Sequence, residues 1–282
     1  MVKTGKITFQ GEVGAYSDLA CRTFQPDFEP VACATFEKAM AAVGEGQAEL
    51  ALLPVENSLA GRVSDIHVLL PQSDLHITGE YFMPIHHQLM ARPGVCLDDI
   101  KTVRSHAMAL GQCRRLFTDY PFKPEASGDT AGAARTLAEQ GQTDVGVIAS
   151  VMAAETYGLT ILKKDIEDRG HNTTRFLLMA REPGDVTADD GTIVTSFVFQ
   201  VRNIPSALYK ALGGFATNGV NMTKLESYQL EGSFTATMFY ADIEGHPDER
   251  AVQLALEELG FFSSSLKILG IYPSARQRGA LP

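Results

Sequence analysis

Leu50-Ala-Leu-Leu-Pro-Val-Glu-Asn57 is the stretch of sequence that decides the fold class. Its first five residues form a continuous apolar run, which is typical of a strand buried on both faces of a sheet. Two polar residues, Glu56 and Asn57, come almost directly after that run. A strand holds such terminal side chains rigidly while the following loop exposes them. We therefore expect a buried sheet with a functional site at the end of this strand.

Strand and helix patterns alternate on both sides of this stretch. Short apolar segments predict strands at Lys6–Gln10, Pro30–Ala34, Thr102–Arg104 and Asp144–Ala149. Helical spacing predicts helices at Tyr16–Phe24, Phe36–Gly46, around Val63–Leu70, Met108–Thr118, Thr130–Gln140 and Val151–Gly158. This alternation is typical of an α/β protein with mostly parallel strands.

The segment from Leu75 to Arg92 departs from the alternation and contains two long extended stretches. We interpret them as strands that leave one lobe and enter another, and Leu159–Ala180 as the return. The sequence therefore predicts a domain over residues 1–181, with one lobe at about 1–80 and 160–181 and a second at about 81–159. A cleft between two such lobes is a common place for a small-molecule site.

The C-terminal third has a different pattern. Residues 182–192 are polar, contain proline and glycine, and are predicted to be a linker. Residues 193–275 then read as strand, helix, strand, strand, helix and strand. Pro205 opens the first of these helices, and Glu231-Gly232 forms the turn between the second and third strands. The order βαββαβ is ferredoxin-like.

The composition indicates a folded protein with an acidic balance. Of 282 residues, 45% are hydrophobic and 21% charged, and the formal net charge is -10. This disfavours a nucleic-acid partner, because no basic stripe can displace counterions from phosphates. No apolar run reaches the ~18 residues of a membrane span, and no apolar signal region precedes Ile7. We expect a cytoplasmic protein that does not bind membranes.

Cysteine and histidine spacing does not fit a metal motif. The four cysteines form no C-x-x-C pair; they are Cys21, Cys33, Cys96 and Cys113. His86 and His87 are adjacent, so in a strand they would point to opposite faces. We expect reduced thiols, no metal and no cofactor.

Several short segments, in order along the chain, resemble those of monofunctional prephenate dehydratases with a C-terminal ACT domain. In the first 181 residues they are Phe-Gln-Gly-Glu-Val-Gly-Ala-Tyr-Ser17, Leu-Pro-Val-Glu-Asn-Ser-Leu-Ala-Gly61, Ser-His-Ala-Met-Ala-Leu-Gly-Gln112, Asp-Thr-Ala-Gly-Ala-Ala134 and Asn-Thr-Thr-Arg-Phe176. In the C-terminal part they are Pro-Ser-Ala-Leu-Tyr209 and Lys-Leu-Glu-Ser-Tyr228. The resemblance covers nearly the whole chain and is colinear.

The resemblance implies a fold and a reaction. The fold would be a two-lobed catalytic domain like type 2 periplasmic binding proteins, followed by the ferredoxin-like ACT domain. The reaction would be that of a carbon-oxygen lyase, which converts prephenate to phenylpyruvate, CO2 and water in phenylalanine biosynthesis. Hydroxide is a poor leaving group, so the main task is to protonate it or bind it by a strong hydrogen bond.

The catalytic residues implied by the resemblance start with Thr174. Its hydroxyl would donate to the leaving oxygen or relay a proton; as an alternative, it would only bond backbone at the start of a strand. Asn57 would donate to substrate oxygens, and Glu56 is the candidate for a carboxylic acid with a raised pKa. The pair Asn57-Ser58 could instead cap the next helix. Arg175 could bind a substrate carboxylate or form an inter-lobe salt bridge.

The remaining site residues begin helices or follow strands. Ser105 and Gln112 would complete the catalytic set, with Ser105 also a plausible N-cap of the following helix. Ser17 and Thr130 would bind substrate at two further helix starts. Asp129 would cap the helix that begins at Thr130.

The ACT part resembles modules in which L-phenylalanine binds between paired domains and inhibits. The implied phenylalanine-binding residues are Ala207, Leu208, Asn221, Glu226 and Ser227. The chain would then form a homodimer or homotetramer. The family's Glu-Ser-Arg-Pro reads Glu226-Ser-Tyr-Gln229 here, which leaves the strength of inhibition open. In the alternative, these residues only seal a dimer.

Two other functions remain open. One is arogenate dehydratase, the same elimination on the amino-acid analogue of prephenate. The other is a non-catalytic regulator that binds an amino acid in a two-lobed domain.

Overall fold

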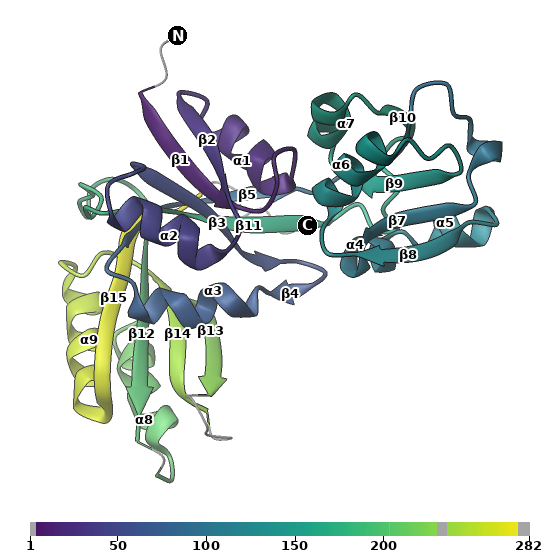
Figure 1. Ribbon diagram of the computed structural model, residues 1–282. Coiled ribbons are helices and arrows are strands. Elements are labelled where there is room, and N and C mark those ends of the chain that lie inside the picture. Colours follow the sequence, from purple (N-terminus) through teal and green to yellow (C-terminus); the bar gives the residue numbers. More distant parts are fainter. Residues whose placement is uncertain (1–3, 203, 230–235, 276–282) are drawn as a thin grey trace. The chain divides into compact units, whose positions relative to one another are not determined.

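The computed structural model of the chain describes residues 4–202, 204–229 and 236–275 (Figure 1). Their contacts divide the chain into two compact units, Met1–Ile66 with Tyr81–Phe176, and His67–Glu80 with Leu177–Pro282. Helix α3 (Ser64–Leu69) and strands β5 (His76–Pro84) and β11 (Thr173–Ala180) each pass from one unit to the other. The predicted domain limits at 181 and 193 remain a prediction. The division by contacts groups 67–80 and 177–181 with the C-terminal elements.

The first sheet of unit one contains the strand formed by Leu50–Asn57. Its strand order is β11-β3-β1-β2, with β4 beside β3. The strands are β1 (Gly5–Gln10), β2 (Phe28–Cys33), β3 (Leu50–Asn57) and β4 (Gly61–Arg62), and the helices are α1 (Tyr16–Phe24) and α2 (Phe36–Gly44). β1 pairs in parallel with both β2 and β3. Ala51, Leu52 and Leu53 are fully buried, which explains the continuous apolar run.

A second sheet in unit one has the order β10-β6-β9-β7-β8. Its strands are β6 (Gln88–Ala91), β7 (Thr102–His106), β8 (Lys123–Ser127), β9 (Val145–Ala149) and β10 (Thr160–Lys163). Its helices are η2 (Leu97–Asp99), α4 (Ala107–Gln112), α5 (Arg114–Asp119), α6 (Thr130–Gln140) and α7 (Val151–Tyr157). β7 is parallel to β8 and β9, whereas β6 runs antiparallel to β9 and β10. The predicted α/β class is confirmed by these two sheets and their helices.

Two expectations about unit one are wrong. The single helix predicted at Met108–Thr118 is broken at Cys113 into α4 and α5. The break is stabilised by Asp168, whose carboxylate accepts the backbone N–H groups of Arg114 and Arg115 at the start of α5. The predicted strand through His86 and His87 is also interrupted, because residues 85–87 form a loop between β5 and β6.

Unit two contains the ferredoxin-like order of elements. It consists of β12 (Ile193–Val201), α8 (Ala207–Thr217), β13 (Met222–Gln229), β14 (Ala236–Glu244), α9 (Arg250–Phe262) and β15 (Ser263–Pro273). The strand order is β13-β14-β12-β15, with β5 beside β15 and η1 (Leu70–Gln72) preceding β5. The βαββαβ order predicted for residues 193–275 is confirmed, whereas the turn predicted at Glu231-Gly232 lies outside the described residues.

The core of unit two explains the alternation along β12. Phe197, Phe199 and Val201 face one side of the sheet and pack against α8 and α9, through residues such as Phe215 and Leu259. Alternate residues of a strand point to opposite faces, so one face of the sheet carries both helices.

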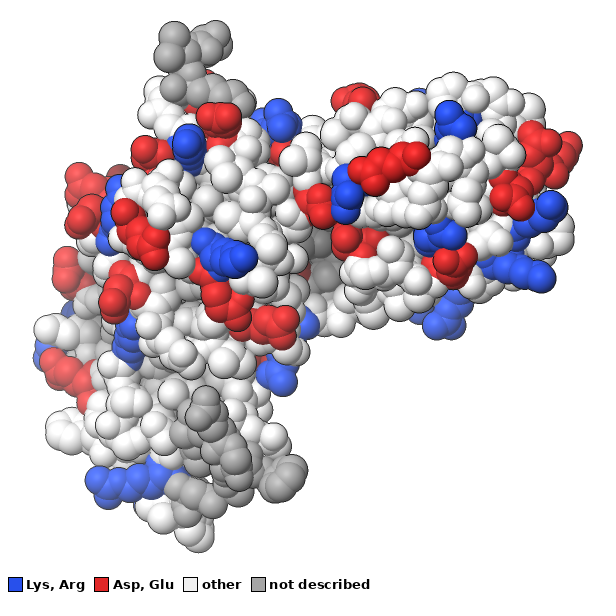
Figure 2. All heavy atoms as spheres, in the orientation of Figure 1, with Lys and Arg blue, Asp and Glu red and all other residues white. Residues whose placement is uncertain are grey.

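Among the described residues, no helix is both long enough and apolar enough to cross a membrane. Lysine and arginine side chains are interspersed with aspartate and glutamate on the face of the molecule drawn in Figure 2. The acidic excess is therefore not gathered into a single patch on that face.

Candidate active site

Six polar side chains of unit one are joined by a continuous series of hydrogen bonds. We call this series the polar chain. Its members, in order, are Thr174, Asn57, Asn172, Gln112, His87 and Tyr16. They come from β3, β11, α4, α1 and the two loops before β6 and β11.

Asn57 has its amide orientation fixed by the backbone. Its Oδ1 accepts the N–H groups of Leu59 and Ala60 at 3.0 and 2.9 Å, so this atom is the oxygen. Its Nδ2 therefore faces Thr174 Oγ1 at 3.0 Å and Asn172 Oδ1 at 2.8 Å, and donates to both. The expected cap is thus present, on the turn at 58–60 instead of on a helix.

The next two amides are oriented by Asn57. Asn172 is buried, and because its Oδ1 accepts from Asn57, its Nδ2 donates to Gln112 Oε1 at 2.9 Å. Gln112 Oε1 also lies 2.8 Å from His87 Nε2. The Gln112 Nε2 group has no acceptor among the described residues and is available to a ligand.

The Thr174 hydroxyl is left with a free proton. Thr174 is buried, 8% exposed, and in the described part of the chain its Oγ1 only accepts, from Asn57. Donation by Asn57 polarises the hydroxyl and strengthens any hydrogen bond that it donates in turn. Thr174 and Gln112 therefore each present an oriented donor, and such a donor can stabilise negative charge that develops on a ligand oxygen during a reaction.

At the far end of the polar chain, His87 is buried and Tyr16 is half-buried. His87 is 3% exposed, and its Nδ1 lies 2.6 Å from the hydroxyl of Tyr16. Burial lowers the pKa of His87, although the Gln112 contact and the nearby Glu167 oppose this. Burial also raises the pKa of Tyr16, with Cys113 and Glu167 adding to the effect. Both groups are therefore neutral near pH 7.

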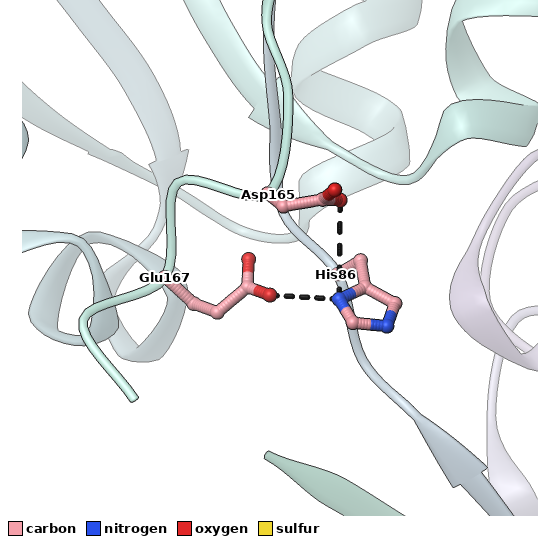
Figure 3. Close-up of side chains that lie close together, drawn as sticks. All are labelled: His86, Asp165 and Glu167. Atoms are coloured by element: carbon pink, nitrogen blue, oxygen red, sulfur yellow. Dashed lines mark hydrogen bonds and ion pairs between the residues drawn. The ribbon is translucent and has the colours of Figure 1, made fainter. Parts of the chain in front are cut away.

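The loop that carries His87 is held by a cluster of His86, Asp165 and Glu167. Figure 3 shows the His86 ring facing both carboxylates; its Nδ1 is 2.7 Å from Glu167 and 3.9 Å from Asp165. Possible ligand atoms of the three residues lie within 4.8 Å of one another, a donor set that suits a divalent metal. Glu167 also accepts the backbone N–H of His87 at 2.9 Å. The expected absence of metal remains a prediction.

A hollow of about 420 Å³ lies elsewhere in unit one, between β1, β2 and α2. Its lining includes Lys6, Cys33 and Lys38, and it contains no member of the polar chain. We therefore place the candidate active site at the polar chain.

Residues 7–184 match the family model for prephenate dehydratase. The chain belongs to the prephenate dehydratase family. This confirms the family predicted from the sequence motifs, and with it a dehydratase activity of the lyase type.

Relatives of this dehydratase differ in the activities for which they are described. A bifunctional N-acyl-homoserine lactone acylase/prephenate dehydratase of Komagataeibacter europaeus is 49% identical, covering 95% of this chain and 96% of its own. Arogenate dehydratase 2 of Petunia hybrida is 39% identical, covering 95% and 72%. A crystal structure of prephenate dehydratase from Arthrobacter aurescens with L-Phe is 30% identical with a TM-score of 0.88, covering 98% and 92%.

Of the predicted catalytic residues, the structure brings Thr174, Asn57 and Gln112 of this dehydratase together in the polar chain. Glu56 is half-buried at the end of β3, opposite Arg62 of β4. Ser105 is fully buried and donates to the backbone oxygen of Ile148 at 2.6 Å. Its expected role as N-cap is wrong, because His106 caps α4.

The predicted substrate-binding residues lie at helix starts or in β11. Ser17 is buried in the first turn of α1, and Thr130 is the half-buried first residue of α6. Asp129 caps α6, as predicted. Arg175 is buried in β11 next to Thr174. These side chains are not members of the polar chain, and their roles remain predictions.

The predicted phenylalanine-binding residues lie at two places in unit two. Ala207 and Leu208 begin α8. Asn221 precedes β13 and donates to Glu244 at 2.8 Å, while Glu226, which lies 3.2 Å from Lys224 Nζ, and Ser227 belong to β13. Their role in binding is not tested by this arrangement.

Three members of the polar chain were not predicted as site residues, namely Asn172, His87 and Tyr16. Asn172 and Tyr16 were inside the motifs that carried the resemblance, so their position was a usable signal. His87 had no such signal, because its partners Tyr16 and Gln112 are 71 and 25 positions away.

Proposed function

We propose that this family member converts prephenate to phenylpyruvate, CO2 and water in the cytoplasm, with no cofactor. Residues 1–181 would form the catalytic domain and residues 193–275 an ACT domain that senses phenylalanine. The proposal combines the family of the chain with one observation about its site, which is the free hydroxyl proton of Thr174.

The reaction requires a donor at the leaving oxygen. The ring carboxylate leaves as CO2, and the electrons of its carbon–carbon bond enter the ring while the C4–oxygen bond breaks. The departing hydroxide must take up one proton to leave as water. The Thr174 hydroxyl, buried and polarised by Asn57, supplies the hydrogen bond to this oxygen.

Gln112 supplies a second donor through its Nε2, for a carboxylate or carbonyl oxygen of the substrate. Arg175 and Glu56 also belong to the proposed site. Arg175 would bind a substrate carboxylate by its planar guanidinium. Glu56 would serve as the carboxylic acid that supplies the proton to the departing hydroxide.

The test is to add substrate to the purified protein and follow product absorbance. We expect phenylpyruvate from prephenate, and a lower kcat/KM with arogenate, the substrate class of the Petunia relative. A higher kcat/KM with arogenate would make the chain an arogenate dehydratase. Turnover of neither substrate, with binding retained, would indicate the non-catalytic regulator. An N-acyl-homoserine lactone is assayed in parallel, because the Komagataeibacter relative is described as an acylase for it.

We further propose that L-phenylalanine inhibits the enzyme by binding to the ACT domain of a homodimer or homotetramer. The proposal is supported by the Arthrobacter relative, which was crystallised with L-Phe. Ala207, Leu208, Asn221, Glu226 and Ser227 would contact the amino acid. Equilibrium dialysis with labelled phenylalanine should show saturable uptake that Glu226→Gln weakens. An absence of uptake by the wild-type protein would refute the proposal.

A further inference from the structure

The side chain of His87 lies between Tyr16 and Gln112 in the polar chain. Its Nδ1 is 2.6 Å from the Tyr16 hydroxyl and its Nε2 is 2.8 Å from Gln112 Oε1. We propose that His87 and Tyr16 are positioning residues that hold the Gln112 amide with its Nε2 directed to the substrate. This inference rests on the proposed function, because it assigns their action to the same site.

The proton on the histidine ring is placed by its two neighbours. Gln112 Oε1 carries no hydrogen, so His87 Nε2 must be the protonated nitrogen that donates to it. A neutral ring has only one such proton, which leaves Nδ1 bare. Nδ1 then accepts the hydroxyl proton of Tyr16 at 2.6 Å, a shorter contact than the 3.1 Å from this hydroxyl to its other acceptor, the backbone oxygen of His86. Donation from Tyr16 thus stabilises this tautomer of His87, which together with Asn172 holds Gln112 in its orientation.

The opposite tautomer would disrupt the polar chain. A bare Nε2 would require Gln112 to turn its amide group around and donate from Nε2 to His87. That nitrogen would then also face Asn172 Nδ2, which is itself a donor. The substrate would meet Oε1, an acceptor, and a carboxylate there would be repelled.

Both positioning residues are held from outside the polar chain. The backbone N–H of His87 donates to Glu167 Oε2 at 2.9 Å, and its carbonyl accepts from Ile166 N–H at 2.9 Å. Figure 3 shows that the adjacent His86 is held by the same Glu167. The backbone and the ring of His87 are therefore fixed independently.

Tyr16 is placed by the turn that precedes α1. Gly14 in this turn approaches α7 so closely that a Cβ atom would lie 3.1 Å from Ala153 Cα. Ser150 Oγ donates to the Gly14 carbonyl at 2.6 Å, and Tyr157 OH donates to that of Val13 at 2.7 Å. The Tyr16 ring then meets the His87 ring edge to face, with 5.5 Å between centroids.

The kinetic test is a double-mutant cycle of Tyr16→Phe and Gln112→Ala in kcat/KM for prephenate. We expect Tyr16→Phe to lower kcat/KM about tenfold in the wild-type background and less than about twofold when Gln112 is already alanine. The matched control is Tyr81→Phe, which removes a hydroxyl that accepts from Gln25 and should leave kcat/KM unchanged. Equal losses from Tyr16→Phe in both backgrounds would overturn the inference.

The ring proton is tested on the free protein, without substrate. In a ¹H–¹⁵N spectrum of ¹⁵N-histidine protein, with His87 assigned by its loss in His87→Gln, we expect a protonated Nε2 and a bare Nδ1. Tyr16→Phe should populate the other tautomer. A protonated Nδ1 in the wild type would overturn the inference, and the spectrum gives this answer even if prephenate is not a substrate.

His87→Gln, which retains a donor at the position of Nε2, should keep more activity than His87→Asn.

Discussion

Asn57 Nδ2 donates a hydrogen bond of 3.0 Å to Thr174 Oγ1, although the two residues are 117 positions apart in the sequence. The bond links the end of β3 to the start of β11. It occupies an acceptor site on the threonine and leaves the hydroxyl proton free. Thr174 is thereby defined as a donor before any substrate arrives.

Asn57→Asp should separate the two tasks of this residue. The carboxylate still accepts the N–H groups of Leu59 and Ala60, so the turn at 58–60 should survive. It can donate neither to Thr174 nor to Asn172, and Thr174 would turn its proton toward it. We expect kcat to fall by about 10²-fold, the usual effect of losing an oriented donor, with little change in melting temperature. An unchanged kcat would show that the Asn57–Thr174 bond does not matter for the reaction.

His87 should make stability depend on pH. Burial, together with His86, lowers its folded pKa below the ordinary 6.5, against the opposing effects of Gln112 and Glu167; Tyr16 also faces the ring. The unfolded chain then binds a proton that the folded chain does not. The stabilisation is fully present above pH 6.5 and is lost as the pH falls toward the folded pKa.

The measurement is urea unfolding of the wild type and His87→Gln from pH 7.5 to 5. The difference in free energy of unfolding between them should shrink as the pH falls. A difference that stays constant or grows would contradict the lowered pKa.

Two glycines with left-handed backbones allow strain and crowding to be separated. Gly14 and Gly61 have φ of 84° and 81°, but a Cβ atom meets Ala153 Cα at 3.1 Å only at Gly14 and open space at Gly61. Gly61→Ala should cost about 1–2 kcal/mol of stability from the backbone alone. Gly14→Ala should cost about 1–3 kcal/mol more from overpacking. Equal losses in chemical denaturation would argue against the close approach to α7.

The four thiols should differ in reactivity. Cys96 is exposed, whereas burial raises the pKa of Cys21 and Cys113. Cys33 is only partly buried; its pKa is also raised by burial, and the charge of Lys38 opposes this rise. The thiolate is the reactive form. A thiol reagent at pH 8 should modify Cys96 first, and Cys21 and Cys113 only upon unfolding. Mass spectrometry that finds Cys21 or Cys113 labelled early would contradict their burial.

Local patterns in the sequence were sufficient to predict the α/β class, the βαββαβ order and the buried strand at Leu50–Pro54, which in the structure continues to Asn57. The break at Cys113 was not predictable, because Asp168 stabilises it from 54 positions away. The loop at His86 and His87 was missed for a similar reason. Its backbone is bonded to Glu167 and Ile166, so alternation in the local sequence carried no information about it.

The candidate site was predictable only in part. Thr174, Asn57 and Gln112 lie in family motifs, and the structure joins them through Asn172. Ser105 lies in a motif too, but its hydroxyl is bonded to Ile148 inside the sheet. The direction of each amide depends on contacts between distant segments, which a single sequence does not show.

The most direct measurement is the turnover of saturating prephenate by Thr174→Ala, with Thr174→Ser as the matched control. Removal of the hydroxyl should lower kcat by about 10²–10³-fold. The serine variant keeps the hydroxyl and should retain most of the activity. Both variants should melt near the wild-type temperature. Wild-type turnover by Thr174→Ala would contradict the assignment of Thr174 as the donor to the leaving oxygen.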